Sequence, residues 1–137
     1  MIQQMNRQRG QSIVEFALIA PVLIIILLGI FDFGWILHHQ TQLDHAVRLG
    51  ARRGAVGESN TVIINRMKDG CVSFELQDED ITIEVRDGAG NPTGDNEDRT
   101  PDNLIYVAID MEVTLNTPLS SIYGPISLHS EAEFLIE

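Results

Sequence analysis

Nineteen consecutive residues near the N-terminus, residues 13–31, contain a single charged side chain, Glu15. At about 1.5 Å per residue, a helix of this length covers roughly 28 Å, close to the hydrocarbon thickness of a bilayer. The run has no amphipathic period, whereas a helix on a soluble core usually keeps one polar face. It therefore predicts a single transmembrane helix, which we place at residues 11–36.

The flanks of this run predict its orientation. Arg7 and Arg9 precede it, and the next basic residue along the chain is Arg48. Because positive charge is retained on the cytoplasmic side, we expect a cytoplasmic N-terminus and an extracytoplasmic domain at residues 37–137. Aromatic rings suit the headgroup region, and the far end of the run carries Phe31, Phe33 and Trp35. We expect Asp32, which lies among them, to reach water.

A cleaved secretory signal also begins with basic residues and an apolar core. Its core is usually about 7–15 residues long and ends in a small-residue cleavage site. Here the run is longer and continues into FDFGWILHHQ, which contains no such site. We therefore expect the membrane segment to be retained.

Glu15 has two interpretations. A carboxylate in a spanning helix costs up to about 3 kcal/mol at mid-membrane and less near an end. In the first interpretation it lies at the cytoplasmic interface, reaches water and favours the helix N-terminus through the dipole. In the second it pairs with a positive group on a neighbouring subunit. Its position in the sequence favours neither.

Pro21 and Gly29 are weak points in the same helix. Proline removes one backbone hydrogen bond and can kink a helix, which membranes tolerate when other groups satisfy the freed carbonyl. Both residues can permit bending when a helix is extracted from the bilayer. They are also ordinary residues of membrane helices, which is the simpler interpretation.

Charge is segregated along the 137 residues. Residues 1–68 carry a formal charge of +3 and residues 69–137 a charge of −14, which sum to −11. An acidic half is a poor partner for nucleic acid, whose phosphates need Lys and Arg. The single cysteine, Cys71, excludes an intramolecular disulfide and is expected to be a small buried hydrophobe. No zinc, nucleophile or phosphate-binding arrangement occurs in the sequence, so we expect neither a cofactor nor catalysis.

The remaining pattern predicts an α+β fold. Helical character continues to about residue 55, and a stripe of Leu43, Val47, Gly50 and Gly54 would let this helix lie close against a sheet. A short helix is predicted at about residues 60–69. Strands are predicted at about 80–87, 103–116 and 126–136, where apolar and polar residues alternate. The expected fold is a long helix whose outer half packs on a three-stranded antiparallel sheet.

Two polar features can each be interpreted either as a solvated surface or as a binding site. Arg48, Arg52 and Arg53 could form a docking face for an acidic subunit, but a solvated face near a helix C-terminus is the simpler interpretation. The loop at residues 87–103 is rich in acids and could bind calcium. It lacks EF-hand spacing, which favours a solvated or partner-contacting loop.

The N-terminal residues carry a resemblance. RQRG followed by QSIVEFALIAPVLIIILLG resembles the N-terminus of type IV prepilin-like proteins, in which a basic leader ends in Gly and a Glu follows five residues later. The wording G-Q-S-x-V-E-F-A-L-x-x-P is similar to the TadE-like pseudopilins of the tight-adherence (Flp) pilus. The HAVRLGARRGAVG stretch and a P-L-x-x-x-x-G motif from Pro118 to Gly124 fit the same family.

This resemblance implies a pilin-like α+β fold and a role for the N-terminal residues. Residues 1–10 would be a leader, cut between Gly10 and Gln11, and Glu15 would be the assembly carboxylate. Many type IV pilins carry Phe after the cut and methylate its amine, so Gln11 departs from that pattern. The implied function is a minor pseudopilin of an adhesive pilus in the cytoplasmic membrane, a peptidase substrate with no activity of its own.

The partners that the resemblance implies are the prepilin peptidase, other minor pseudopilins, the major pilin, and the pilus assembly platform with its ATPase. The alternative is an uncleaved, single-pass surface protein whose acidic domain binds a ligand or cation. The two hypotheses differ at one bond, between Gly10 and Gln11.

Overall fold

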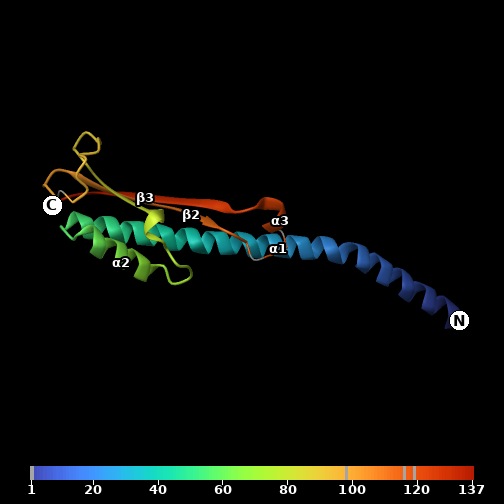
Figure 1. The fold of residues 1–137 in the computed structure, drawn as a ribbon. Helices are drawn as coiled ribbons and strands as arrows, with labels where there is room; N and C mark the ends of the chain where they lie inside the picture. Colours follow the sequence, from blue (N-terminus) through green and yellow to red (C-terminus); the bar gives the residue numbers. More distant parts are fainter. Residues whose placement is uncertain (1, 98, 116, 119) are drawn as a thin grey trace.

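The computed structural model describes residues 2–97, 99–115, 117–118 and 120–137, with side chains described from residue 11 onward. One helix dominates it: α1 (Ile2–Ala55) runs without interruption for 54 residues. Its C-terminal half lies along a small domain, and its N-terminal part projects from that domain as a rod (Figure 1). The helix predicted to end at about residue 55 is therefore a single element that joins the rod to the domain.

A three-stranded antiparallel sheet packs on the C-terminal half of α1. Its strands are β1 (Ile81–Arg86), β2 (Leu104–Val113) and β3 (Ile126–Leu135), in the spatial order β1-β2-β3. A second helix, α2 (Asn60–Gly70), packs against α1 beside it (Figure 1). The predicted α+β fold, with a long N-terminal helix on a three-stranded antiparallel sheet, is confirmed.

The core lies between α1, α2 and the inner face of the sheet. Strand alternation accounts for it, because every second residue of the central strand β2 faces the helices. The fully buried large side chains of the core are Leu43, Val47, Ile63, Met67, Val85, Ile105, Val107, Ile109 and Ile136. Cys71 is buried with them, as the sequence predicted.

Two glycines of the small-residue stripe allow close packing of α1, against α2 as well as against the expected sheet. A Cβ added at Gly50 would lie 2.5 Å from the Met67 Sδ, so this glycine faces α2. A Cβ added at Gly54 would overlap the Cδ1 of Ile105 on β2 and lie 3.2 Å from the Ile63 Cδ1 on α2. The prediction that the stripe faces a sheet is thus incomplete, since the stripe lies where α2 and the sheet both meet α1.

Two further short helices were not predicted. A 3₁₀ turn, η1 (Asp78–Asp80), precedes β1, and α3 (Ser120–Tyr123) lies in the connection from β2 to β3. Elements of three or four residues show no detectable hydrophobic period, which explains why the sequence did not reveal them. Figure 1 places α3 at the end of the domain nearest the rod.

Candidate functional site

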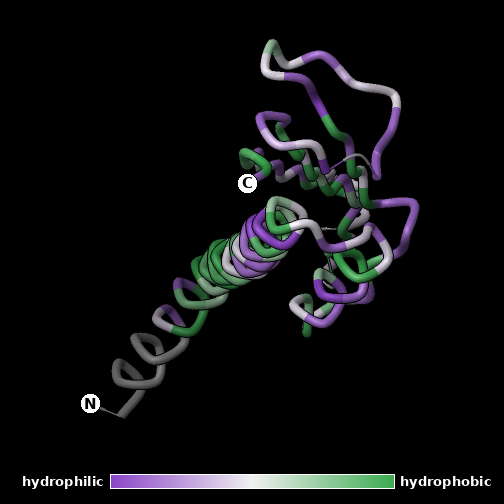
Figure 2. Tube along the Cα trace, turned by 90° about the vertical axis from the view of Figure 1, so that its left-hand side faces the viewer, coloured by the Kyte–Doolittle hydropathy of each residue, from purple (hydrophilic) through white to green (hydrophobic). Residues whose placement is uncertain are grey.

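The projecting part of α1, residues 11–31, is largely exposed among the residues that the structure describes. None of these residues is buried, and only Ala20 and Leu28 are half-buried. Among the described residues, one helix is long and apolar enough to cross a membrane, Gln11–Ala55, and none of its most apolar stretch is buried. Figure 2 shows hydrophobic residues along the rod and polar residues over much of the outer loops. The segment fits a single-pass membrane protein.

The predicted processing and assembly residues lie at the N-terminal end of this rod. The Nε2 of Gln11 donates a hydrogen bond to the Oε1 of Glu15 at 3.1 Å, one helical turn away. Gly10 lies within α1, but side-chain surroundings before residue 11 are outside the described part of the chain. Within the chain, the carboxylate of Glu15 therefore accepts a hydrogen bond from the side-chain amide of Gln11, the residue that would follow the cut.

Pro21 and Gly29, the predicted flexible points, both lie inside α1. The helix continues through Pro21 to Ala55. Nothing lies within 4 Å of the position a Cβ would take at Gly29. Gly29 lines a cavity of about 480 Å³ at the base of the domain, together with residues of the β2–β3 connection. Their role in bending stays a prediction.

Asp32 marks the point where the rod meets the domain, and the expectation that it reaches water is wrong. It is 6% exposed, and its Oδ2 accepts a hydrogen bond of 2.6 Å from the Oγ1 of Thr117, which is 9% exposed. The connection between β2 and β3 folds back onto α1 here and covers the carboxylate. The two residues are 85 positions apart, so local sequence gave no sign of the contact.

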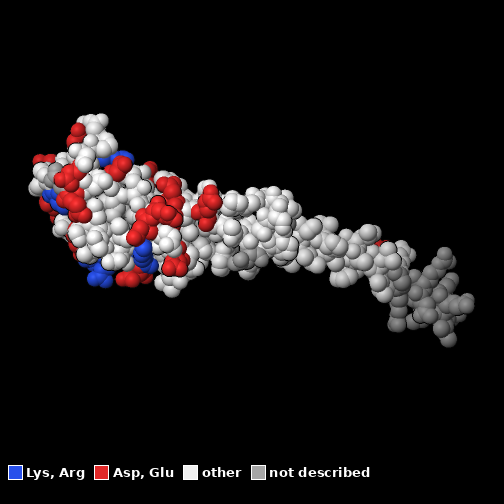
Figure 3. All heavy atoms as spheres, viewed as in Figure 1, with Lys and Arg blue, Asp and Glu red and all other residues white. Residues whose placement is uncertain are grey.

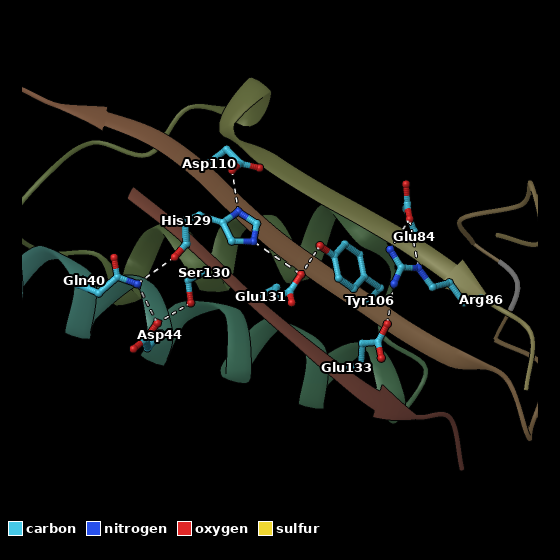
Figure 4. Close-up of polar contacts among 10 residues, drawn as sticks. All are labelled: Gln40, Asp44, Glu84, Arg86, Tyr106, Asp110, His129, Ser130, Glu131 and Glu133. Carbon is cyan, nitrogen blue, oxygen red and sulfur yellow. Dashed lines mark hydrogen bonds and ion pairs between the residues drawn. The ribbon is translucent and has the colours of Figure 1, made fainter. Parts of the chain in front are cut away.

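Polar contacts also fix the outer half of α1 on β3. Ser130 donates to the Oδ1 of Asp44 at 2.6 Å. Gln40 donates to the same carboxylate at 3.2 Å and to the carbonyl of His129 at 2.9 Å (Figure 4). A hydrogen bond to a charged group is worth about 1.5–3 kcal/mol when partly buried. These contacts set the position of the sheet along α1.

The outer face of the sheet carries a row of paired side chains, which we call the outer-face row. Its members are Glu84 and Arg86 on β1, Tyr106 and Asp110 on β2, and His129, Glu131 and Glu133 on β3 (Figure 4). The antiparallel register brings them together, since Tyr106 pairs with both Glu84 and Glu133, and Asp110 pairs with His129.

One end of the row is centred on Arg86. Its guanidinium lies 2.6 Å from Glu133 and 3.1 Å from Glu84, and its Cζ is 3.6 Å from the centre of the Tyr106 ring. The hydroxyl of Tyr106 donates to Glu131 at 2.7 Å. This hydrogen bond raises the pKa of Tyr106 and lowers that of Glu131.

The other end is centred on His129. Its Nδ1 lies 2.6 Å from Asp110 and its Nε2 lies 3.6 Å from Glu131. The hydrogen bond to Asp110 raises the pKa of His129. The spacing of this histidine in the sequence reveals no partners for it. An alternating strand pattern would have revealed them only once the β2–β3 register was known.

The first acid of the loop that suggested calcium, Asp87, is engaged in a turn. The Asp87 carboxylate accepts hydrogen bonds from the backbone of Ala89 and Asn91, and the contacts with Asn91 lower its pKa. No group of three or more His, Cys, Asp or Glu side chains that could hold a metal occurs among the residues that the structure describes.

The family model for TadE-like proteins matches residues 10–52. Over this segment the chain is similar to TadE-like proteins. The match begins at the glycine of the expected cut and covers the rod and most of the helix that packs on the domain, so the suspected resemblance is borne out over these residues. No curated protein and no solved structure matches the chain. The sheet, which lies outside the matched segment, is known from the structure alone.

Proposed function

We propose that this TadE-like chain is a minor pseudopilin of a tight-adherence pilus, cleaved between Gly10 and Gln11 by a prepilin peptidase. The observation that carries the proposal is the coincidence of two features in one segment. The TadE-like match covers residues 10–52, and the same helix carries an apolar rod whose large side chains are mostly exposed in the described part of the chain. A soluble domain gains nothing from such a rod, whereas a bilayer or a bundle of like helices buries it.

The charge of the chain supports a function for the cut. Cleavage would remove Arg7 and Arg9, the two positive charges that hold the N-terminus on the cytoplasmic side. The remaining seven basic and twenty acidic residues would leave a charge of −13. A chain without its cytoplasmic anchor charges is easier to draw out of the membrane toward an assembling pilus.

Glu15 would act after the cut. The new α-amine at Gln11 is a positive group, and an opposite charge within about 4–6 Å favours the ionised carboxylate. Pairing Glu15 with the amine of a neighbouring subunit would convert a costly group in an apolar helix into a contact that fixes the register between subunits. In the structure, Glu15 accepts a hydrogen bond from the uncharged side-chain amide of Gln11, and the proposed pairing would replace this contact.

The domain would then face the extracytoplasmic side, with its acidic residues toward water and its partners. We propose the prepilin peptidase, other minor pseudopilins, the major pilin and the pilus assembly platform as partners. We also propose that the chain has no catalytic role, because the polar side chains of the outer-face row are paired with one another on the exposed face of the sheet.

The decisive experiment is the intact mass of the membrane-extracted chain, expressed with and without a prepilin peptidase. We expect a chain that begins at Gln11 only when the peptidase is present, and no cleavage of a Gly10→Val variant. Gly34→Val is the matched control, since it makes the same substitution at another glycine of α1, where no described atom lies within 4 Å of an added Cβ. A wild-type chain that retains residues 1–10 beside an active peptidase would refute the proposal and favour the uncleaved anchored protein.

A further inference from the structure

We propose that α3 and the turn after it, residues 120–125, form a second membrane contact that inserts into the headgroup region beside α1. Ile122 and Tyr123 would be the inserting side chains. This inference rests on the proposed membrane insertion of the rod. It adds that the domain itself meets the lipid surface at a defined edge.

The first observation is exposure. Ile122 is 73% exposed and Tyr123 is 68% exposed, and no residue of α3 is buried. A short helix with no buried residue leaves these two large side chains available to another surface. Tyrosine suits a membrane boundary because its ring is apolar and its hydroxyl can stay hydrated.

The second observation is position. Tyr123 lines the cavity at the base of the domain together with Ile25, Gly29 and Phe33 of α1. The apolar run ends at residue 31 and the predicted span at residue 36, so these helix positions lie in the outer part of the span, next to the headgroup region. Tyr123 is therefore level with the outer end of the predicted span, just inside its boundary.

The third observation is charge. No Asp, Glu, Lys or Arg occurs between Glu112 and Glu131, although the half-chain from residue 69 holds sixteen acidic residues. On the face shown in Figure 3, acidic side chains gather over the part of the domain remote from the rod. Carboxylates are expensive to bring to a lipid surface, because they lose water and are repelled by anionic headgroups. Their absence from this edge favours lipid as the covering surface.

Local contacts hold this edge at a fixed height. Thr117 is tied to Asp32 by the buried hydrogen bond, and the backbone N–H of Ser120 donates to the Thr117 carbonyl at 3.0 Å. The N–H of Gly124 donates to the Ser120 carbonyl at 2.9 Å, and Gly124 has a φ of 70°, which glycine adopts without strain. The P-L-x-x-x-x-G motif thus builds the turn that presents Ile122 and Tyr123.

Depth-dependent quenching tests the inference. The full chain carries one tryptophan, so Trp35→Phe provides a background into which a single tryptophan can be returned. We would place it at Ile122 and reconstitute the protein in vesicles of phosphatidylcholine and phosphatidylglycerol that contain brominated lipid. The matched control is Val72→Trp, because Val72 is an apolar residue 88% exposed on another part of the domain. Leu18→Trp reports insertion of the rod.

We expect strong quenching at position 18, quenching at position 122 several-fold greater than at position 72, and a blue-shifted emission at position 122. Quenching at 122 equal to that at 72, with position 18 quenched, overturns the inference and leaves the membrane span standing. Absence of quenching at position 18 overturns the span and the inference together. Emission at 122 that shifts only when the vesicles are crowded with protein shows that a second copy covers this edge, which also overturns the inference.

Discussion

Replacement of Thr117 by valine tests whether the buried contact with Asp32 locks the domain onto α1. Valine keeps the shape of threonine but removes the hydroxyl that donates to the Oδ2 of Asp32 at 2.6 Å. A hydrogen bond to a charged group contributes about 1.5–3 kcal/mol, and Asp32, at 6% exposed, would keep little access to water as compensation. We therefore expect a loss of about 2 kcal/mol in the free energy of unfolding, a large share of the ~5–15 kcal/mol typical of a domain.

The assay is urea unfolding of the full chain in detergent micelles, followed by the fluorescence of Trp35. Trp35 lies one helical turn from Asp32 and packs against the core, so its emission reports on this part of the domain. The matched control is Thr41→Val, because Thr41 is exposed and donates only to the Leu37 carbonyl of its own helix. We expect the control to change stability by less than about 0.5 kcal/mol.

A double-mutant cycle with Asp32→Asn separates the contact from general effects of each substitution. We expect a coupling of at least about 1 kcal/mol, since two residues in direct contact do not act additively. Equal losses for Thr117→Val and Thr41→Val, or additive effects of Thr117→Val and Asp32→Asn, would refute the reasoning.

Three further predictions concern the domain. Gly54→Ala should cost about 1–2 kcal/mol, because overlap with a buried isoleucine on β2 outweighs the gain in helix propensity, whereas Gly34→Ala in open space should cost nothing measurable by urea unfolding. The raised pKa of His129 stabilises the protein below its unfolded-state pKa of about 6.5, and this is lost as pH rises through the folded-state value, so His129→Gln should flatten that part of the stability–pH curve. Burial raises the pKa of Cys71, so iodoacetamide should alkylate it far more slowly in the folded chain than in urea. A steep pH dependence in His129→Gln, or equal alkylation rates in both states, would contradict these expectations.

Much of the architecture could be predicted because it depends on periodicity. Nineteen residues with one charge predict a membrane-length helix, and alternation along residues 104–113 predicts a strand with one buried face. These signals are local, since each follows from which neighbours along the chain share a face. The similarity to TadE-like proteins also depends on a local sequence pattern, over residues 10–52.

The contacts that the sequence did not reveal join residues far apart in the chain. Asp32 looked like a residue at a wet membrane boundary because its neighbours are aromatic, but burial depends on a connection 85 positions later. His129 looked unpartnered because Asp110 is nineteen positions away, and only the antiparallel register makes them opposite one another. Such pairs would need strand pairing and loop placement before they could be predicted.

In the proposed arrangement, two carboxylates lie near the two ends of the apolar stretch of α1, where the helix passes between lipid and water. Glu15 and Asp32 are 17 residues apart, which is about 26 Å along a helix and close to the thickness of the hydrocarbon layer. Each is hydrogen-bonded within the chain, Glu15 to the Gln11 amide and Asp32 to Thr117, so neither end of the apolar stretch places a lone carboxylate against lipid. The contact at Glu15 is exposed and can be exchanged for a neighbour's amine, whereas the contact at Asp32 is buried and fixes the domain. In this proposal a carboxylate therefore serves assembly at one boundary of the span, and another anchors the domain at the opposite boundary.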